Sequence, residues 1–201
     1  VKHALKRSYR TIVLTGFSLG GGVVLKFLGE SGPYLQSRIK AAVVFSVPID
    51  LPDANIAMAR RQNAIYLRRF MGTLNEKARF KAKQFPEHLV PDKPLPKDFA
   101  GFDGDYTGPI HGYANAEDYW YSCSSLHFLP NIGRPTLIIN AADDSFLGAS
   151  CYPAALADEH PFVHLEVPQY GGHCGFYSPQ KDGSYWNERR AYEFVMEQLK
   201  H

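Results

Sequence analysis

Apolar residues along this chain occur in two patterns, as short continuous runs and as longer stretches in which they recur every three to four positions. Four short runs rich in valine, isoleucine and leucine are typical of strands covered on both faces, and they lie at 12–15, 39–47, 135–139 and 162–167. Helical periodicity follows three of these runs, at about 20–31, 150–159 and 187–199. Because strand, helix and strand in succession make a βαβ unit, the sequence predicts an α/β fold with a mostly parallel sheet and helices on both faces.

The stretch between the second and third runs departs from this alternation. Residues 53–85 have a helical and basic pattern with eight Lys or Arg side chains, and no strand-like run interrupts them. Residues 86–109, rich in Pro, Asp and Gly, are expected to form a long irregular connection, and 115–125 a short helix. The chain is therefore predicted to be one domain over 1–201 with a helical insertion at about 53–125. Such a block suits a lid, and a surface insertion with no gating role fits equally well.

Length, charge and cysteine usage narrow the class of protein. With 201 residues, the chain is long enough for one domain with a sizeable core. Its 22 basic and 20 acidic side chains leave a net charge of +2, which is too balanced to indicate a nucleic-acid partner. No apolar run approaches the roughly 20 residues of a membrane-spanning helix. Three cysteines, without metal-type spacing or the density of a disulfide framework, favour reduced thiols and a cytoplasmic location, and they are Cys123, Cys151 and Cys174.

The segment with most chemical information joins the first strand to the helix that follows it. There the sequence Gly16-Phe17-Ser18-Leu19-Gly20 places a serine between two glycines. Glycines two residues on either side allow a sharp turn without side-chain clashes, and such a turn raises a serine Oγ above the edge of the sheet. Ser18 is therefore a candidate nucleophile, and the N–H of Leu19 is a candidate donor to an oxyanion.

A serine hydroxyl is a weak nucleophile at neutral pH, so it needs a neighbouring base, and that base needs a group that orients it. Asp143 or Asp144 follows the third strand-like run, and His173 lies in a glycine-rich loop after the fourth. The order Ser, Asp, His is that of α/β-hydrolases. Each residue also has an ordinary interpretation, as a capping or turn aspartate and as a loop histidine bound to a carbonyl. Cys174 is a weaker nucleophile candidate because it lies outside the elbow, and we expect it to face away.

Four segments resemble, in the same order, those of the YheT-like α/β-hydrolases, the bacterial relatives of ABHD-type esterases and of yeast medium-chain acyltransferase/esterases. They lie at 16–21, 110–114 with 118–119, 135–146 and 171–176. The resemblance implies the α/β-hydrolase fold and a serine hydrolase that acts on carboxylic esters without a metal or organic cofactor. Ser18 carries over as the nucleophile, His173 as the base, and Asp144, or alternatively Asp143, as the acid.

The same resemblance implies early strands and an oxyanion loop ahead of the nucleophile strand. Only 11 residues precede Ile12, so we expect the N-terminal portion of the fold and the second oxyanion donor to be missing from this chain. Three positions depart from the family pattern without removing a catalytic group, and they are Gly22, Ser145 and Cys174.

The expected function is hydrolysis of small-molecule carboxylic esters, with short- or medium-chain acyl groups, through an acyl-enzyme on Ser18. Two alternatives stay open, which are acyl transfer to an alcohol and a hydrolase-like domain that binds a ligand or partner without catalysis. The sequence decides neither the natural substrate nor the choice between Asp143 and Asp144.

Overall fold

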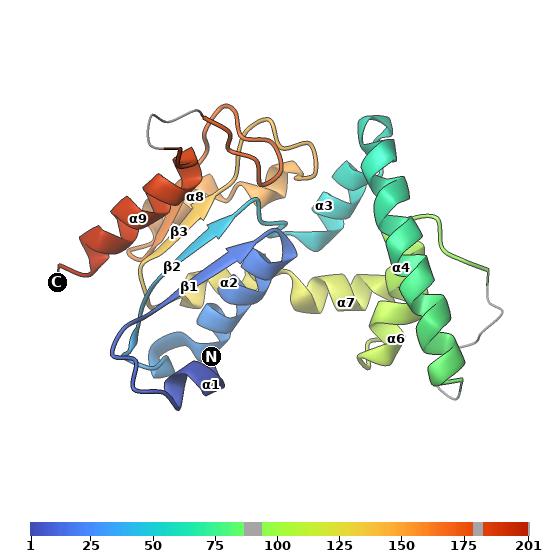
Figure 1. Cartoon of the computed structure of the whole chain (residues 1–201), viewed down its shortest axis with the longest axis horizontal. Helices are drawn as coiled ribbons and strands as arrows, with labels where there is room; N and C mark the ends of the chain where they lie inside the picture. The colour runs from blue at the N-terminus through green and yellow to red at the C-terminus, as the bar shows by residue number, and fades with distance from the viewer. Residues whose placement is uncertain (87–93, 179–182, 201) are drawn as a thin grey trace. The chain divides into compact units, whose positions relative to one another are not determined.

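The computed structural model describes residues 1–86, 94–178 and 183–200, and the chain forms two compact units (Figure 1). One unit comprises Val1–Asp50 together with Ser124–His201, and the other comprises Leu51–Cys123. All the candidate catalytic residues belong to the first unit. The architecture of that unit therefore decides whether they meet.

Four parallel strands form the sheet of the first unit, in the order β1-β2-β3-β4. They are β1 (Ile12–Phe17), β2 (Ile39–Phe45), β3 (Thr136–Ile139) and β4 (Val163–Glu166). In the register, Thr15 pairs with Val43, and Val43 pairs with Leu137. Every residue of β2 except Lys40 is buried, because helices cover both sides of the strand and both sides must then be apolar. The predicted parallel sheet is confirmed.

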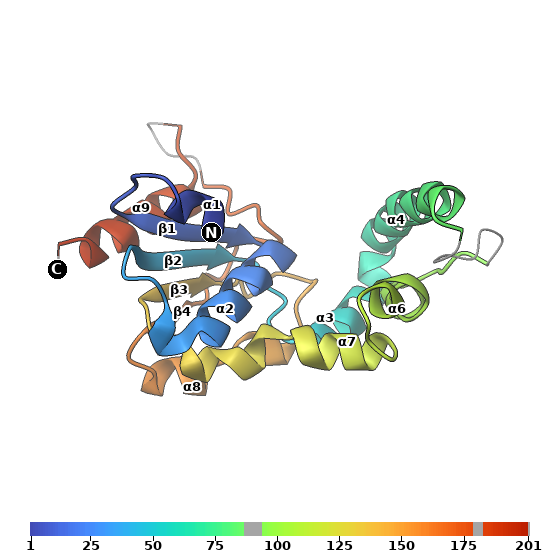
Figure 2. The ribbon, with the colours of Figure 1, turned by 90° about the horizontal axis from the view of Figure 1, so that it is seen from below.

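Helices cover the two faces of this sheet (Figure 2). On one face, Val44 of β2 shares a hydrophobic core with Leu28, and on the other face Val43 shares a core with Phe194. The elements on the first face are α2 (Leu19–Ser31), η4 (Ser125–Asn131) and α8 (Ala154–Glu159). The second face is covered by α9 (Trp186–Gln198). The alternation of β2 side chains between these cores makes the strand the centre of the unit.

Three short helical segments complete the first unit, and they are α1 (Lys2–Leu5), η1 (Gly32–Tyr34) and η5 (Ala149–Cys151). The helix predicted over 150–159 begins only at Ala154. Tyr152 precedes Pro153, and a residue before proline is disfavoured in the helical region; its backbone is accordingly non-helical, with φ −122° and ψ 73°.

The second unit consists of helical segments, and its described residues include no strand. The segments are α3 (Leu51–Met58), η2 (Arg61–Asn63), α4 (Ala64–Gln84), α5 (Phe99–Phe102), the π-helical η3 (Asp103–Thr107), α6 (Gly108–Ile110) and α7 (Ala116–Cys123). Within the described part of the chain, no helix is both long and apolar enough to cross a membrane.

The irregular connection predicted for 86–109 is wrong in its second half, where helical turns run from Phe99 to Ile110. Residues 87–93 of that prediction lie outside the described residues. These turns are stabilised by side-chain hydrogen bonds and do not show a helical pattern of apolar residues. Asp98 accepts a hydrogen bond from the N–H of Gly101 at 2.8 Å. The indole N–H of Trp120 donates to Asp103 Oδ2 at 2.8 Å. Local composition does not reveal contacts of this kind.

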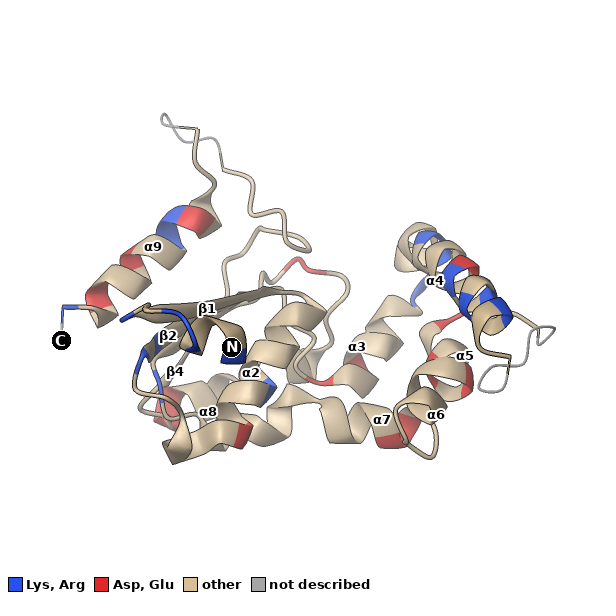
Figure 3. Cartoon of the chain, turned by 60° about the horizontal axis from the view of Figure 1, so that its bottom comes forward, with Lys and Arg blue, Asp and Glu red and all other residues tan. Residues whose placement is uncertain are grey.

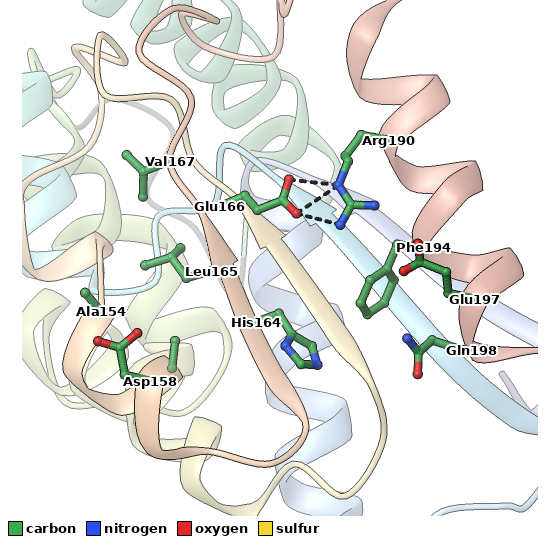
Figure 4. Close-up of a pocket in the computed structure, with 11 residues that line it drawn as sticks. Ala154, Asp158, His164, Leu165, Glu166, Val167, Arg190, Phe194, Glu197 and Gln198 are labelled. Carbon is green, nitrogen blue, oxygen red and sulfur yellow. Dashed lines mark hydrogen bonds and ion pairs between the residues drawn. The ribbon is translucent and has the colours of Figure 1, made fainter. Parts of the chain in front are cut away.

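A cavity of about 610 Å³ lies beside the edge strand β4, between α8 and α9 (Figure 4). Arg190 of α9 spans part of it with an ion pair of 2.6 Å to Glu166, and its Nε donates to the same carboxylate at 2.8 Å and 3.0 Å. His164 also lines the cavity. None of the serine, aspartate and histidine candidates lines it, so their chemistry belongs elsewhere in the unit.

Candidate active site

A sharp turn joins β1 to α2, and Ser18 sits at its apex. Its backbone has φ 51° and ψ −128°, a strained conformation for a residue with a side chain. Two hydrogen bonds hold it there, from Ser18 N to the Phe45 carbonyl at 2.8 Å and from Gly21 N to the Ser18 carbonyl at 2.9 Å. A Cβ added at Gly16 would lie 2.5 Å from the Gly20 carbonyl oxygen. The close approach of the two backbone segments therefore requires glycine at position 16, two residues before the serine, as the elbow motif predicts.

The three residue types that the sequence singled out form one continuous chain of polar contacts. His173 Nε2 lies 2.9 Å from Ser18 Oγ, and His173 Nδ1 lies 2.9 Å from Asp144 Oδ2. A carboxylate can only accept a hydrogen bond, so Nδ1 of a neutral imidazole carries the proton and Nε2 can accept from the serine hydroxyl. The geometry is that of a serine, a base and a group that orients the base.

The two adjacent aspartates occupy different environments. Asp144 is 3% exposed, and its other oxygen accepts a hydrogen bond from the N–H of Phe146 at 3.0 Å. Asp143 Oδ1 instead accepts from the N–H groups of Gly171 and Gly172 at 2.9 Å and 2.7 Å. One aspartate therefore contacts the histidine ring, and the other holds the backbone of the loop that carries the histidine.

The charge state of His173 depends on opposing influences. Burial lowers its pKa, but hydrogen bonds to Asp144 and Cys174, together with the negative charge of Asp144, outweigh burial and raise the pKa to about 9. The ring of Phe146 stacks on the imidazole at 4.4 Å between centroids. The thiol of Cys174 thus lies close to His173, and the expectation that Cys174 faces away from the site is wrong.

Leu19 is the first residue of α2, so its N–H is among the amides that a helix leaves without an internal partner. The positive end of the helix dipole lies at the same point, next to Ser18. This is the position that the sequence predicted for an oxyanion donor. The described residues contain no group of three or more His, Cys, Asp or Glu side chains arranged to bind a metal ion, and the expected absence of a cofactor stays a prediction.

Sequence reasoning missed a buried amide that joins the ends of two strands. Asn140 follows β3 and is fully buried. Its Oδ1 accepts from the N–H of Val47 at 2.7 Å, and its Nδ2 donates to the carbonyls of Val47 at 3.1 Å and Cys151 at 2.8 Å. These bonds connect the chain beyond β2 to the segment that leads to Asp144. A polar residue directly after the apolar run Leu137–Ile139 was the available signal.

Ser46 is a second residue that the sequence did not indicate. It is fully buried directly after β2, with φ 51°. Its Oγ accepts a hydrogen bond from the N–H of Cys174 at 2.8 Å. Ser46 therefore positions the backbone next to His173, and nothing in its local sequence distinguishes it from an ordinary loop serine.

The family model described as the alpha/beta hydrolase fold matches residues 8–180, and the chain belongs to this family. Among its relatives, YheT of Escherichia coli (strain K12), which is named as a candidate esterase, is 34% identical over 164 residues, covering 80% of this chain and 47% of YheT. Bovine (Bos taurus) phospholipase ABHD3 is 28% identical, with 92% of this chain and 46% of the relative covered. These matches confirm the YheT-like resemblance.

A yeast (Saccharomyces cerevisiae) medium-chain fatty acid ethyl ester synthase/esterase is also 28% identical, over 92% of this chain and 45% of its own length. The chain therefore spans about half the length of these relatives. Among solved structures, an esterase from Pyrococcus furiosus matches with a TM-score of 0.52 and 19% identity, over 98% of this chain and 59% of that protein. This structural match supports the fold alone.

Proposed function

We propose that the protein is a serine hydrolase of carboxylic esters in which Ser18 is the nucleophile, His173 the general base and Asp144 the residue that orients it. The observation that carries this proposal is the pair of 2.9 Å contacts that joins the three side chains at a strained elbow. Relatives named as an esterase, a phospholipase and an ester synthase/esterase support the same class of reaction. Asp143 is proposed to support the loop and to take no part in proton transfer.

The reaction proceeds in two steps. Ser18 Oγ attacks the ester carbonyl while its proton passes to His173 Nε2, and the resulting tetrahedral intermediate expels the alcohol, which takes that proton. Water then attacks the acyl-enzyme and gives a proton to His173, and collapse of the second intermediate releases the carboxylic acid and returns the proton to Ser18. The N–H of Leu19 donates to the oxyanion in both steps, and the dipole of α2 favours the same negative charge.

The acyl group is proposed to be short or medium in length. Acyl transfer to an alcohol is the second candidate, because one relative is named for both ester synthesis and ester cleavage. The balance between the two depends on how well water is excluded from the acyl-enzyme. We propose that the helical insertion at about 53–125 acts as a lid that excludes water, within a single hydrolase domain over 1–201.

Covalent labelling tests the proposal directly. A fluorophosphonate probe should attach once per chain, and peptide mass spectrometry should locate the adduct on Ser18. The folded protein should also hydrolyse a series of p-nitrophenyl esters, and added ethanol should yield ethyl esters if acyl transfer competes. Heat-denatured protein is the control, because labelling requires the assembled site. A folded protein that binds acyl ligands but neither reacts with the probe nor hydrolyses esters would support the non-catalytic alternative.

The pKa of His173 predicts a pH dependence. Only the neutral imidazole can take the serine proton, and the pKa of about 9 keeps the ring protonated at neutral pH. We therefore expect kcat/KM to rise about tenfold per pH unit through the neutral range and to level off near pH 9. Initial rates, corrected for spontaneous ester hydrolysis, give this profile. A profile that is already level at neutral pH would contradict the expectation.

A further inference from the structure

We propose that the outward face of α4 binds the surface of membranes that contain anionic lipids. The inference rests on the residues of α4 alone and does not require the proposed catalytic activity. The proposed partner is a lipid surface.

Basic side chains strongly outnumber acidic ones on this helix. Figure 3 shows several blue segments along the ribbon of α4 and few red ones among them. The 21 residues of α4 contain one acidic side chain, Glu76, and six basic ones, so the helix carries +5 where the whole chain carries +2. The basic residues are Arg68, Arg69, Lys77, Arg79, Lys81 and Lys83. The remaining residues therefore carry −3 in sum, and α4 is a surface that attracts anions.

These six basic side chains are available to a partner. All are exposed, and none forms an ion pair with another residue in the described part of the chain. Lys81 lies over the ring of Phe85 at 5.3 Å, a contact that keeps its ammonium group at the surface. An exposed basic cluster of this density loses free energy through self-repulsion unless an anionic partner neutralises it.

Apolar side chains project from the same face. Ile65 is 79% exposed and Phe80 is 60% exposed. At 3.6 residues per turn, Ile65, Phe80 and Lys83 point within about 60° of one another. Large apolar side chains on a solvent-exposed surface indicate an interaction site when they occur together with charges of one sign.

The opposite face of α4 already has its partners within the helical unit. Ala78 and Ala82 pack with Tyr106 and Phe102 in a small core. Asn75 Nδ2 donates to the carbonyl of Pro96 at 2.9 Å. Packing inside the unit thus explains the inner stripe of the helix and leaves the basic and apolar face outward.

The combination favours a lipid surface over other anionic partners. Long Lys and Arg side chains reach the headgroups while apolar side chains enter the boundary between headgroups and acyl chains. A nucleic acid would engage the charges and could stack on Phe80, but Ile65, the more exposed of the two, offers its bases no ring. An aliphatic group and a phenyl ring among six cations therefore match a membrane interface best.

Vesicle flotation of the Ser18→Ala protein tests the proposal without hydrolysis of the lipid. Binding is expected to vesicles of phosphatidylcholine with phosphatidylserine, much less to phosphatidylcholine alone, and to weaken as salt is added. Each basic residue near an anionic surface contributes about fivefold to the partition coefficient, so the triple variant Arg69→Gln, Arg79→Gln, Lys83→Gln should bind about a hundredfold more weakly. A second variant, Ile65→Gln with Phe80→Gln, should also bind more weakly at unchanged charge.

The matched control removes three exposed charges from the other unit, by Lys2→Gln, Lys6→Gln and Arg10→Gln, and should bind as the parent does. Glutamine is a good helix former, and circular dichroism checks that each variant is folded. If the control and the triple α4 variant lost vesicle binding equally, the proposal would be overturned, because binding would then depend on the net charge of the protein and not on α4. Binding to oligonucleotides that vesicles do not displace would also overturn it.

Discussion

Replacing Ser18 by alanine is expected to lower kcat for ester hydrolysis by about 10⁴- to 10⁶-fold with little change in KM. The hydroxyl is the atom that bonds to the acyl carbon, and His173 Nε2, at 2.9 Å from it, then has no serine proton to accept. Removing the side chain leaves the elbow intact, because backbone hydrogen bonds from Ser18 N and Gly21 N hold it. The measurement is steady-state hydrolysis of p-nitrophenyl esters by the purified variant.

Cys174→Ala provides the matched control for that experiment, because Cys174 is the other nucleophilic side chain close to His173. The alanine variant at 174 should keep its activity and show a pH profile shifted to lower pH, since one contribution that raises the pKa of His173 is removed. Unchanged melting temperatures would show that both variants are folded. If Ser18→Ala remained active and Cys174→Ala did not, the proposed nucleophile would be wrong.

The second large effect is expected from Asp144→Asn, which should lower kcat by about 10⁴-fold. Asparagine at this position can donate an N–H to His173 Nδ1, and the ring proton then lies on Nε2. A protonated Nε2 cannot accept the proton of Ser18. The loss of the negative charge also removes part of what raises the pKa of His173. The pH at which the residual activity levels off should therefore be lower in the variant than in the parent protein.

Asp143→Asn is the matched comparison, because it changes the same group at the neighbouring position. An asparagine Oδ1 still accepts the two hydrogen bonds from Gly171 N and Gly172 N, at reduced strength because the charge is gone. Activity should fall by about tenfold or less, with a small loss in the free energy of unfolding. Activities in the reverse order, with Asp143→Asn the more damaging, would contradict the assignment of the acid.

The sequence was sufficient for the sheet and for the positions of the candidate residues. Buried strands such as β2 require apolar side chains on both faces, and the elbow requires glycine where Gly16 meets the Gly20 carbonyl. Both constraints act on nearby residues and therefore leave a local pattern. The order Ser18, then Asp143 or Asp144, then His173 followed from which segments come after strands that share an edge of the sheet.

The choice between Asp143 and Asp144 was beyond the sequence because the two differ only in what their side chains face. Asn140 was missed for a related reason, since its three partners at Val47 and Cys151 are brought together by the sheet. The helical turns of 99–110 depend on Trp120 and on Asp98, and composition alone indicated a loop. Long-range side-chain bonds account for each of these differences.

The contact between Ser18 and His173 joins residues 155 positions apart in the chain. At a synthesis rate of roughly 5 to 20 residues per second, about 8 to 30 seconds separate the two residues as they leave the ribosome. Throughout that interval the nascent polypeptide carries a serine without its base. On the proposed mechanism it cannot acylate itself or cleave cellular esters before the last strand of the sheet has been made, so the order of the genetic message itself keeps the unfinished enzyme inactive.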